Sequence, residues 1–263
     1  MADFLNKTFR AFDRAAFAGM HALHNAAGGF FNGLCKAVSF LADGGWCYIA
    51  AALSLILFCR TRKIGLSMGI ALVIGALLTN IILKNAVQRP RPYTQSAEFH
   101  DWWVAAGSNI ENSYSFPSGH ATASFAAMVA FFASGKKKYS WAGLPFAALV
   151  AFSRVYLIVH YATDVLAGFI IGSIAGVCGA LLCKLVYAKA GGKFKTVLYE
   201  VDAVTIANAR KNKRSASTLP PDPPKVDEIF EGVETDSAAT ESANDAPAEN
   251  ANEEGEETNE GTL

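Results

Sequence analysis

Residues 165–188 read VLAGFIIGSIAGVCGALLCKLVYA, an apolar run in which Lys184 is the only charged side chain. A helix needs about 20 apolar residues to cross the hydrocarbon core of a bilayer, so this run is long enough for one crossing. Five such stretches in one chain make a soluble helical core a poor explanation, and we expect an all-α, polytopic transmembrane bundle of five to six helices. The other four apolar stretches are residues 46–59, 64–83, 121–134 and 141–159, of which the first and third need flanking residues to reach spanning length.

The segment before these stretches has a different pattern. Residues 1–41 interleave aromatic side chains such as Phe9 and Phe17 with charged ones such as Arg10 and Asp13. This pattern favours an amphipathic helix that lies in the membrane interface. A sixth, weaker span across residues 15–41 is the alternative, and it would change the side on which the N-terminus lies.

Charge is divided unevenly along the chain. Residues 1–221 carry a net charge of +13 and residues 222–263 a net charge of −13. The acidic part has one aromatic residue, Phe230, and buries too little apolar surface to offset the entropy of ordering it. We therefore expect an amphipathic N-terminal region (1–41), a transmembrane domain (42–190), a basic juxtamembrane segment (191–221) and a disordered acidic tail (222–263).

The basic connections predict an orientation. Lys and Arg gather at residues 60–63, 136–138 and 189–214, which follow successive pairs of predicted spans. Because Lys and Arg accumulate in cytoplasmic loops, these connections and the acidic tail are predicted to be cytoplasmic. The connection 84–119 and the turn 160–164 then lie on the extracytoplasmic side.

Three polar clusters interrupt the apolar sequence at the predicted outer ends of the spans. They read KNAVQRPRP at residues 84–92, SFPSGH at residues 115–120 and SRVYLIVHYATD at residues 153–164. Charged groups at such places are costly in a membrane and usually serve a function. Lys84 and Arg91 have no acidic neighbour in sequence, whereas Arg89 is interpreted as ordinary juxtamembrane charge.

The second cluster predicts an anion site. Pro117, Ser118 and Gly119 would end a loop and open a helix, whose free N–H groups attract an anion. His120 would then stand beside the bound anion. A capped helix without a ligand is the alternative.

The third cluster predicts a paired histidine. His160 and Asp164 are four residues apart, so one helical turn would bring the carboxylate to the imidazole. Such a pair fixes the tautomer and leaves the other ring nitrogen free to attack. Arg154 adds a planar fork that matches phosphate oxygens. A single histidine near an apolar helix is more often structural, and the pairing with Asp164 and Arg154 favours the functional interpretation.

The spacing of the three clusters resembles the three-part motif of the type 2 phosphatidic acid phosphatase and vanadium haloperoxidase superfamily. The resemblance covers about residues 44–188 and includes the order and separation of all three parts. It implies a six-helix-type bundle whose motifs converge at the membrane surface. Ala162 stands where many relatives have proline, so we expect a less rigid turn there. The matching motifs are Lys84-x6-Arg91-Pro92, Pro117-Ser118-Gly119-His120 and Ser153-Arg154-x5-His160-x3-Asp164.

The resemblance also implies roles. His160 would attack phosphorus to give a phosphohistidine, with Asp164 orienting its ring. His120 would protonate the leaving group and then activate water. No metal and no cofactor are expected. The phosphoryl oxygens would be held by Lys84, Arg91, Ser118, the Gly119 N–H and Arg154.

The sequence thus leads to the hypothesis of a metal-independent membrane lipid phosphatase of the bacterial undecaprenyl-diphosphatase kind. Phosphatidylglycerophosphate and phosphatidate are alternative substrates, because the phosphate site does not read the lipid chain. A vanadium haloperoxidase is the alternative with the same fold, and a non-catalytic membrane scaffold is the alternative of another class. The expected partners are the lipid substrate and membrane lipids, with no nucleic acid.

Overall fold

A computed structural model gives the fold and describes residues 1–192, 196, 205–210 and 212. All the regular secondary structure in these residues is helical, which confirms the predicted all-α class. The expected acidic tail (222–263) lies outside the described residues, as does most of the expected basic segment (191–221).

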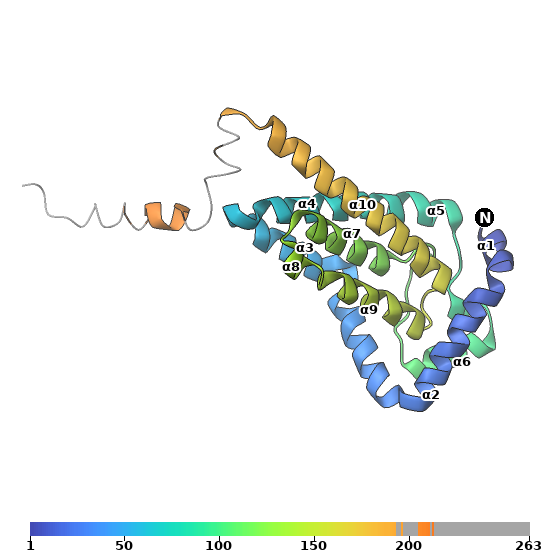
Figure 1. The fold of residues 1–263 in the computed structure, drawn as a ribbon. Helices are drawn as coiled ribbons and strands as arrows, with labels where there is room; N and C mark the ends of the chain where they lie inside the picture. The colour runs from blue at the N-terminus through green and yellow to red at the C-terminus, as the bar shows by residue number, and fades with distance from the viewer. Residues whose placement is uncertain (193–195, 197–204, 211, 213–263) are drawn as a thin grey trace, which may run out of the picture. The chain divides into compact units, whose positions relative to one another are not determined.

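Each of the five predicted apolar stretches is mostly helical, although 46–59 runs past the end of α3 (Trp46–Ile56) and 141–159 extends beyond both ends of α9 (Gly143–Tyr156). Three helical segments of the described chain, Arg10–Ile56, Cys59–Thr94 and Ala162–Lys189, are long and apolar enough to cross a membrane. In Figure 1, α4, α7, α9 and α10 run side by side as a bundle, with α3 against α4. The helices of the bundle are α3 (Trp46–Ile56), α4 (Cys59–Ala76) continued by the π-helical η2 (Leu77–Leu83) and by α5 (Lys84–Val87), α7 (Gly119–Ser134), α8 (Lys137–Ser140), α9 (Gly143–Tyr156) and α10 (Ala162–Lys189).

A stripe of glycines brings α10 close to α7 and α4. A Cβ atom at Gly168 would lie 2.8 Å from the Ser118 carbonyl oxygen, and one at Gly172 only 2.5 Å from that of Thr122. Farther along α10, a Cβ at Gly179 would lie 2.6 Å from the Ser67 carbonyl oxygen of α4. Small residues let helix backbones touch in membranes. The start of α7 is thereby held against the first turns of α10, which joins the second motif to the third.

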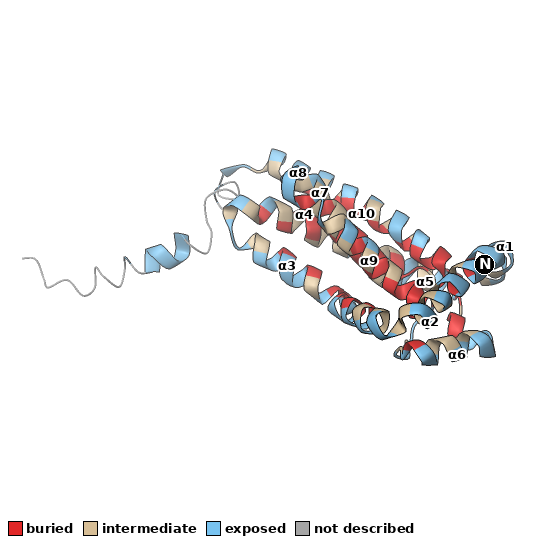
Figure 2. Ribbon diagram, turned by 60° about the horizontal axis from the view of Figure 1, so that its bottom comes forward, coloured by how far each residue is buried: buried red, intermediate tan, exposed pale blue. Residues whose placement is uncertain are grey.

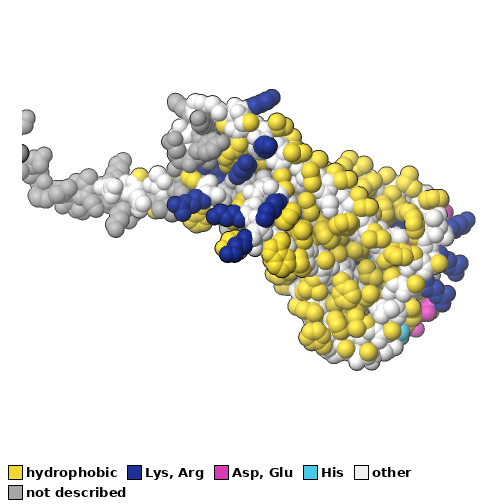
Figure 3. Space-filling view, viewed as in Figure 1, with side chains coloured by type: hydrophobic (Ala, Val, Ile, Leu, Met, Phe, Trp, Pro, Cys, Tyr) yellow, Lys and Arg dark blue, Asp and Glu magenta, His cyan; other side chains and the backbone are white. Residues whose placement is uncertain are grey.

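The outside of the bundle is apolar. Large hydrophobic side chains such as Leu166, Ile170 and Ile174 face outward from α10, while the buried residues face inward (Figure 2). Figure 3 shows a broad apolar band with charged side chains at its two ends. The basic residues 60–63, at the start of α4, and 136–138, at the start of α8, lie at one of these ends. This distribution is the one expected of a transmembrane bundle.

The N-terminal arm, residues 1–41, packs onto this bundle. It consists of α1 (Ala2–Thr8) and α2 (Arg10–Leu41), and α2 bends sharply at Ala27, where φ is −149° and ψ is 32°. Phe17 of α2 is fully buried, with its ring 4.9 Å from Phe99. The predicted helix is present, and the choice between five and six crossings stays a prediction.

The connection between α5 and α7 covers the end of the bundle at which α7 begins and α9 ends. It contains η3 (Pro92–Thr94) and α6 (Ala97–Ala106), and two tryptophans fix it. Trp103 stacks on Tyr93 at 4.7 Å, and Trp102 stacks on His21 of α2 at 4.5 Å. The loop that follows α6 is therefore held over the ends of α7 and α9.

Candidate active site

The three sequence motifs converge on one cavity of about 240 Å³. The apolar side chains of Ile49, Leu72 and Ala123 line another part of it. An adjoining cavity of about 590 Å³ is lined by Arg154 together with His120. The predicted site residues that line the first cavity are Lys84, Arg91, Gly119, His120 and His160.

The second motif positions the start of α7. The helix begins at Gly119 with Ser118 as its N-cap, and the Ser118 hydroxyl accepts from the Ala121 N–H at 3.5 Å. Ser118 is fully buried, and its N–H donates to the Asp164 carbonyl oxygen at 3.1 Å. A Cβ at Gly119 would lie 3.9 Å from Lys84 Nζ, so the ammonium group stands beside the helix N-terminus. The predicted helix start is confirmed, and Ser118 links α7 to α10 beneath the cavity.

His160 presents Nε2 to Arg91. Arg91 Nη1 lies 2.9 Å from His160 Nε2, and a guanidinium can only donate. The Nε2 lone pair is therefore the acceptor, and the proton of the neutral ring is on Nδ1. Burial, followed by the charges of Arg91 and Arg154, lowers the pKa of His160 well below its ordinary value. The geometry thus describes a neutral imidazole with its lone pair on the cavity side.

The predicted pairing of His160 with Asp164 is close but not a hydrogen bond. His160 Nδ1 lies 3.6 Å from Asp164 Oδ2 and has no other hydrogen-bond partner among the described residues. Asp164 itself is fully buried, and Oδ2 accepts from the Tyr161 N–H at 3.1 Å and from the Ser115 hydroxyl. A shift of a few tenths of an ångström would complete the bond to Nδ1.

Arg89 is a residue whose role the sequence interpretation missed. Its side chain is 1% exposed, and Nη1 lies 2.6 Å from Asp164 Oδ1. Ordinary juxtamembrane charge would be hydrated, so that interpretation was wrong. Its partner Asp164 is 75 residues away in sequence, so the pairing could not be predicted from local spacing. The sequence signal that could have found it is that an arginine in an apolar setting needs a counterion.

Glu111 occupies the space between two arginines. Its Oε2 lies 3.3 Å from Arg91 Nη2, and its Oε1 accepts a shorter bond from Arg154 Nη2. Burial raises the pKa of Glu111, but the charges of Arg154 and Arg91 outweigh it and lower that pKa to about 2. The cations that looked uncompensated in sequence thus hold a carboxylate from the loop after α6. Two guanidinium forks around one carboxylate also make a site for a phosphate.

His120 also lines the cavity, next to Asp43. Its side chain is 12% exposed, and Nε2 lies 3.5 Å from Asp43 Oδ1 of η1 (Asp43–Gly45). Burial, followed by the charge of Arg154, lowers the pKa of His120 to about 3. The negative charge of a bound phosphate would favour the protonated ring. Within the described residues, no group of three or more His, Cys, Asp or Glu side chains is arranged to hold a metal ion.

Comparison with known proteins gives one family match. The model of the PAP2 superfamily matches residues 62–189. The chain is 33% identical over 139 residues to the undecaprenyl-diphosphatase of Sulfolobus acidocaldarius, covering 51% of this chain and 63% of that relative. It is 41% identical over 106 residues to phosphatidylglycerophosphatase B of Bacillus subtilis, covering 36% and 46%. The chain thus spans less than two thirds of the length of either curated relative.

A solved structure supports the fold. The crystal structure of a transmembrane PAP2 type phosphatidylglycerolphosphate phosphatase from Bacillus subtilis superposes with a TM-score of 0.54 at 22% identity. The superposition covers 72% of this chain and 93% of that chain. At this identity the likeness concerns the fold alone, and it agrees with the predicted bundle.

Proposed function

We propose that the protein is a membrane phosphatase that removes a phosphate from a lipid, because residues 62–189 match the model of the PAP2 superfamily. The observation that carries the proposal is the contact between Arg91 Nη1 and His160 Nε2 at 2.9 Å. A phosphate that draws the Arg91 guanidinium onto its own oxygens frees the Nε2 lone pair and then lies within reach of it.

Substrate binding replaces the Glu111 carboxylate. The phosphate takes its place between Arg91 and Arg154, and Lys84 contributes a third positive charge from the α5 side. The Gly119 N–H at the start of α7 is a further donor, because the first N–H groups of a helix have no partner within it. These groups hold the phosphoryl oxygens and the charge that grows in the transition state.

The reaction then proceeds in two steps at His160. Its Nε2 lone pair forms a bond to phosphorus, the phosphorus–oxygen bond to the leaving group breaks, and His120 donates a proton to that oxygen. Water next attacks phosphorus while His120 takes a proton from the water, the bond between phosphorus and Nε2 breaks and returns its electron pair to His160, and inorganic phosphate leaves. Asp164 balances the positive charge on the His160 ring between these steps.

Metal independence is part of the proposal. Lys84, Arg91 and Arg154 supply the positive charge that a divalent cation provides in other phosphatases. Activity in the presence of EDTA tests this point directly.

Undecaprenyl diphosphate is the substrate we favour. The name of the 33% identical relative supports it, as does the apolar part of the cavity, where a lipid chain can lie next to Lys84. Phosphatidylglycerophosphate is the second candidate, since the 41% identical relative is named for it. Phosphatidate would use the same phosphate groups.

The test is phosphate release by detergent-purified wild type and His160→Ala, with EDTA present, on each of the three lipids. We expect release by the wild type and a loss of about 1,000-fold or more in the variant, because the nucleophile is missing. The rank order of the lipids identifies the substrate. Full activity of His160→Ala would contradict the assigned nucleophile. Absence of release from every lipid by a folded wild type would favour the non-catalytic scaffold.

A further inference from the structure

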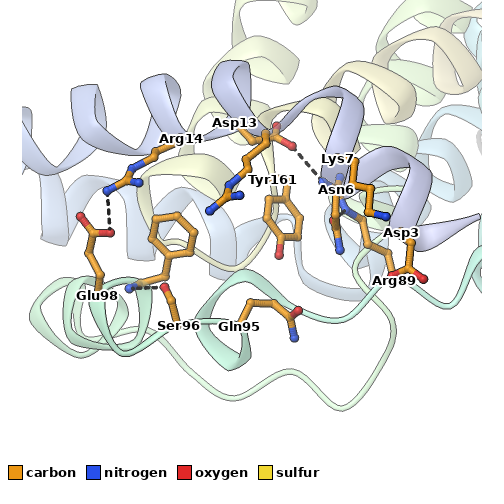
Figure 4. Close-up of a pocket in the computed structure, with 12 residues that line it drawn as sticks. Asp3, Asn6, Lys7, Asp13, Arg14, Arg89, Gln95, Ser96, Glu98 and Tyr161 are labelled. Carbon is orange, nitrogen blue, oxygen red and sulfur yellow. Dashed lines mark hydrogen bonds and ion pairs between the residues drawn. The ribbon is translucent and has the colours of Figure 1, made fainter.

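A buried ion-pair network joins the N-terminal arm to the catalytic turn. Arg89 lies between Asp13 of α2 and Asp164 of α10, with Nη2 2.9 Å from Asp13 Oδ2 and Nη1 2.6 Å from Asp164 Oδ1. The side chains of Arg89, Asp13 and Asp164 are 1%, 4% and 0% exposed. The guanidinium also covers the Tyr161 ring, 3.7 Å from its centroid. Figure 4 shows Asp13 of the arm beside Arg89 and Tyr161, in a pocket that residues of the arm help to line.

Asp13 makes a second set of contacts, with the first turn of α10. Its Oδ1 accepts from the Thr163 N–H at 2.9 Å, and both of its carboxylate oxygens lie within 3.0 Å of the Thr163 hydroxyl. That N–H is at a helix N-terminus and has no partner within the helix. A residue of the arm therefore caps the helix that carries Asp164.

We propose that Asp13 is a positioning residue of the phosphatase reaction, which acts on Asp164 through Arg89 and Thr163. The proposal rests on the function proposed above. It goes beyond the three motifs, because Asp13 lies outside residues 62–189, which match the family.

Charge balance gives the physical reason. If Arg89 paired with Asp164 alone, its positive charge would cancel the negative charge that His160 needs when it becomes a cationic phosphohistidine. Asp13 shares Arg89, so the network of the three side chains keeps a net charge of −1 beside the ring. The remaining charged or titratable groups that face His160 or its partners are Lys84, Arg91, Arg154, Glu111, His120 and Tyr161. Three of these six groups, Lys84, Arg91 and Arg154, are cationic and only Glu111 is anionic, which makes the negative charge from Asp13 more important.

Attachment of the arm does not by itself explain the network. Phe17 is fully buried against Phe99, and such apolar contacts hold a helix without charged groups. Buried ion pairs add little net stability compared with apolar side chains of the same size. If Asp13 holds Asp164 in place and keeps negative charge beside His160, both the burial of Asp13 and its contacts with Arg89 and Thr163 are explained.

Two substitutions with opposite effects on charge test the proposal. Asp13→Asn removes a negative charge, and Arg89→Gln removes a positive one. With saturating inorganic phosphate bound, the His160 imidazole should titrate at lower pH in Asp13→Asn and at higher pH in Arg89→Gln than in wild type. The measurement is histidine NMR of the full chain in detergent micelles, with His160→Gln to assign the signal. Each variant on its own tests the predicted direction of the shift in the His160 titration.

Kinetics supply the second readout. For Asp13→Asn we expect kcat to fall by about tenfold, because the charge acts on the reacting ring, whereas KM stays within about twofold, because Asp13 does not line the phosphate cavity. Asp13→Glu keeps the charge and should keep the wild-type titration. The matched control is Asp101→Asn, an outer-end carboxylate that is 80% exposed, and it should change neither readout.

The outcomes are distinct. Unchanged titration in a folded Asp13→Asn or Arg89→Gln variant, or shifts in the same direction in both, would show a structural link only and overturn the proposal. If wild type releases phosphate and His160→Ala does not, failure of the Asp13 variants leaves the proposed function intact. If wild type is inactive on every lipid, the proposed function fails, and the NMR titration still shows whether Asp13 and Arg89 act on His160.

Discussion

Glu111 places a negative charge at the position that we propose for the substrate phosphate. Its pKa of about 2 lies below the ordinary value of a glutamate, so the carboxylate is ionised at neutral pH. Phosphate therefore competes with Glu111 for Arg91 and Arg154. Glu111→Gln should lower KM and the inhibition constant of inorganic phosphate by about tenfold, which corresponds to about 1.4 kcal/mol. Steady-state kinetics with phosphate as inhibitor measures both constants.

The same substitution should reduce stability, because two buried guanidinium groups lose their counterion. A carboxylate whose pKa is lowered by folding contributes stability that is fully present above its unfolded pKa and lost as pH falls through the folded value. The difference in thermal stability between wild type and Glu111→Gln should therefore be constant above about pH 5 and shrink toward pH 2. Glu98→Gln is the control, because Glu98 pairs with the exposed Arg14. An unchanged phosphate inhibition constant in Glu111→Gln would show that the carboxylate does not occupy the phosphate position.

The sequence allowed some residues of the candidate site to be predicted as neighbours and not others. Lys84, Arg91, His120 and His160 could be predicted as neighbours, because their spacing resembles a known motif, and they do line one cavity. Asp13 could not, because its contact with Arg89 spans 76 residues and depends on where the arm docks.

At the scale of elements, the close packing of α10 explains why two motifs meet. A Cβ at Gly172 would lie 2.5 Å from the Thr122 carbonyl oxygen and 3.0 Å from Phe125 Cβ, so the helices must separate to admit it. Gly172→Ala should therefore lower the thermal inactivation temperature in detergent by several degrees, at a cost of about 1–3 kcal/mol. It should also reduce kcat, because the start of α7 moves away from His160.

Gly69→Ala of α4 is the matched control, since a Cβ there meets nothing within 4 Å. It should leave activity unchanged and keep or slightly raise stability, because alanine is the better helix former. Equal effects of the two substitutions would contradict the packing argument.

The elements themselves were largely predictable. The stretch 165–188 corresponds to α10 (Ala162–Lys189), because a long apolar run has few structural alternatives in a membrane. The bend at Ala27 and the docking of α2 on α9 were not predictable, since residues 1–41 have an amphipathic pattern that suits several placements.

At the scale of the whole molecule, charge is arranged along the bundle axis. The described basic residues 60–63 and 136–138 lie at the starts of α4 and α8, at the opposite end of the bundle from the cavity that His160 lines. Because Lys and Arg remain on the cytoplasmic side, we expect the active site to face away from the cytoplasm. A substrate would then reach His160 from the outer leaflet.

Cysteine labelling of intact cells tests this orientation. In a variant whose five cysteines are serine, we would place one new cysteine at Asn109 or at Lys138, both of which are exposed. A membrane-impermeant maleimide should label Asn109→Cys in intact cells and Lys138→Cys only after permeabilisation. The opposite pattern would place the active site in the cytoplasm. A substrate would then have to reach His160 from the inner leaflet.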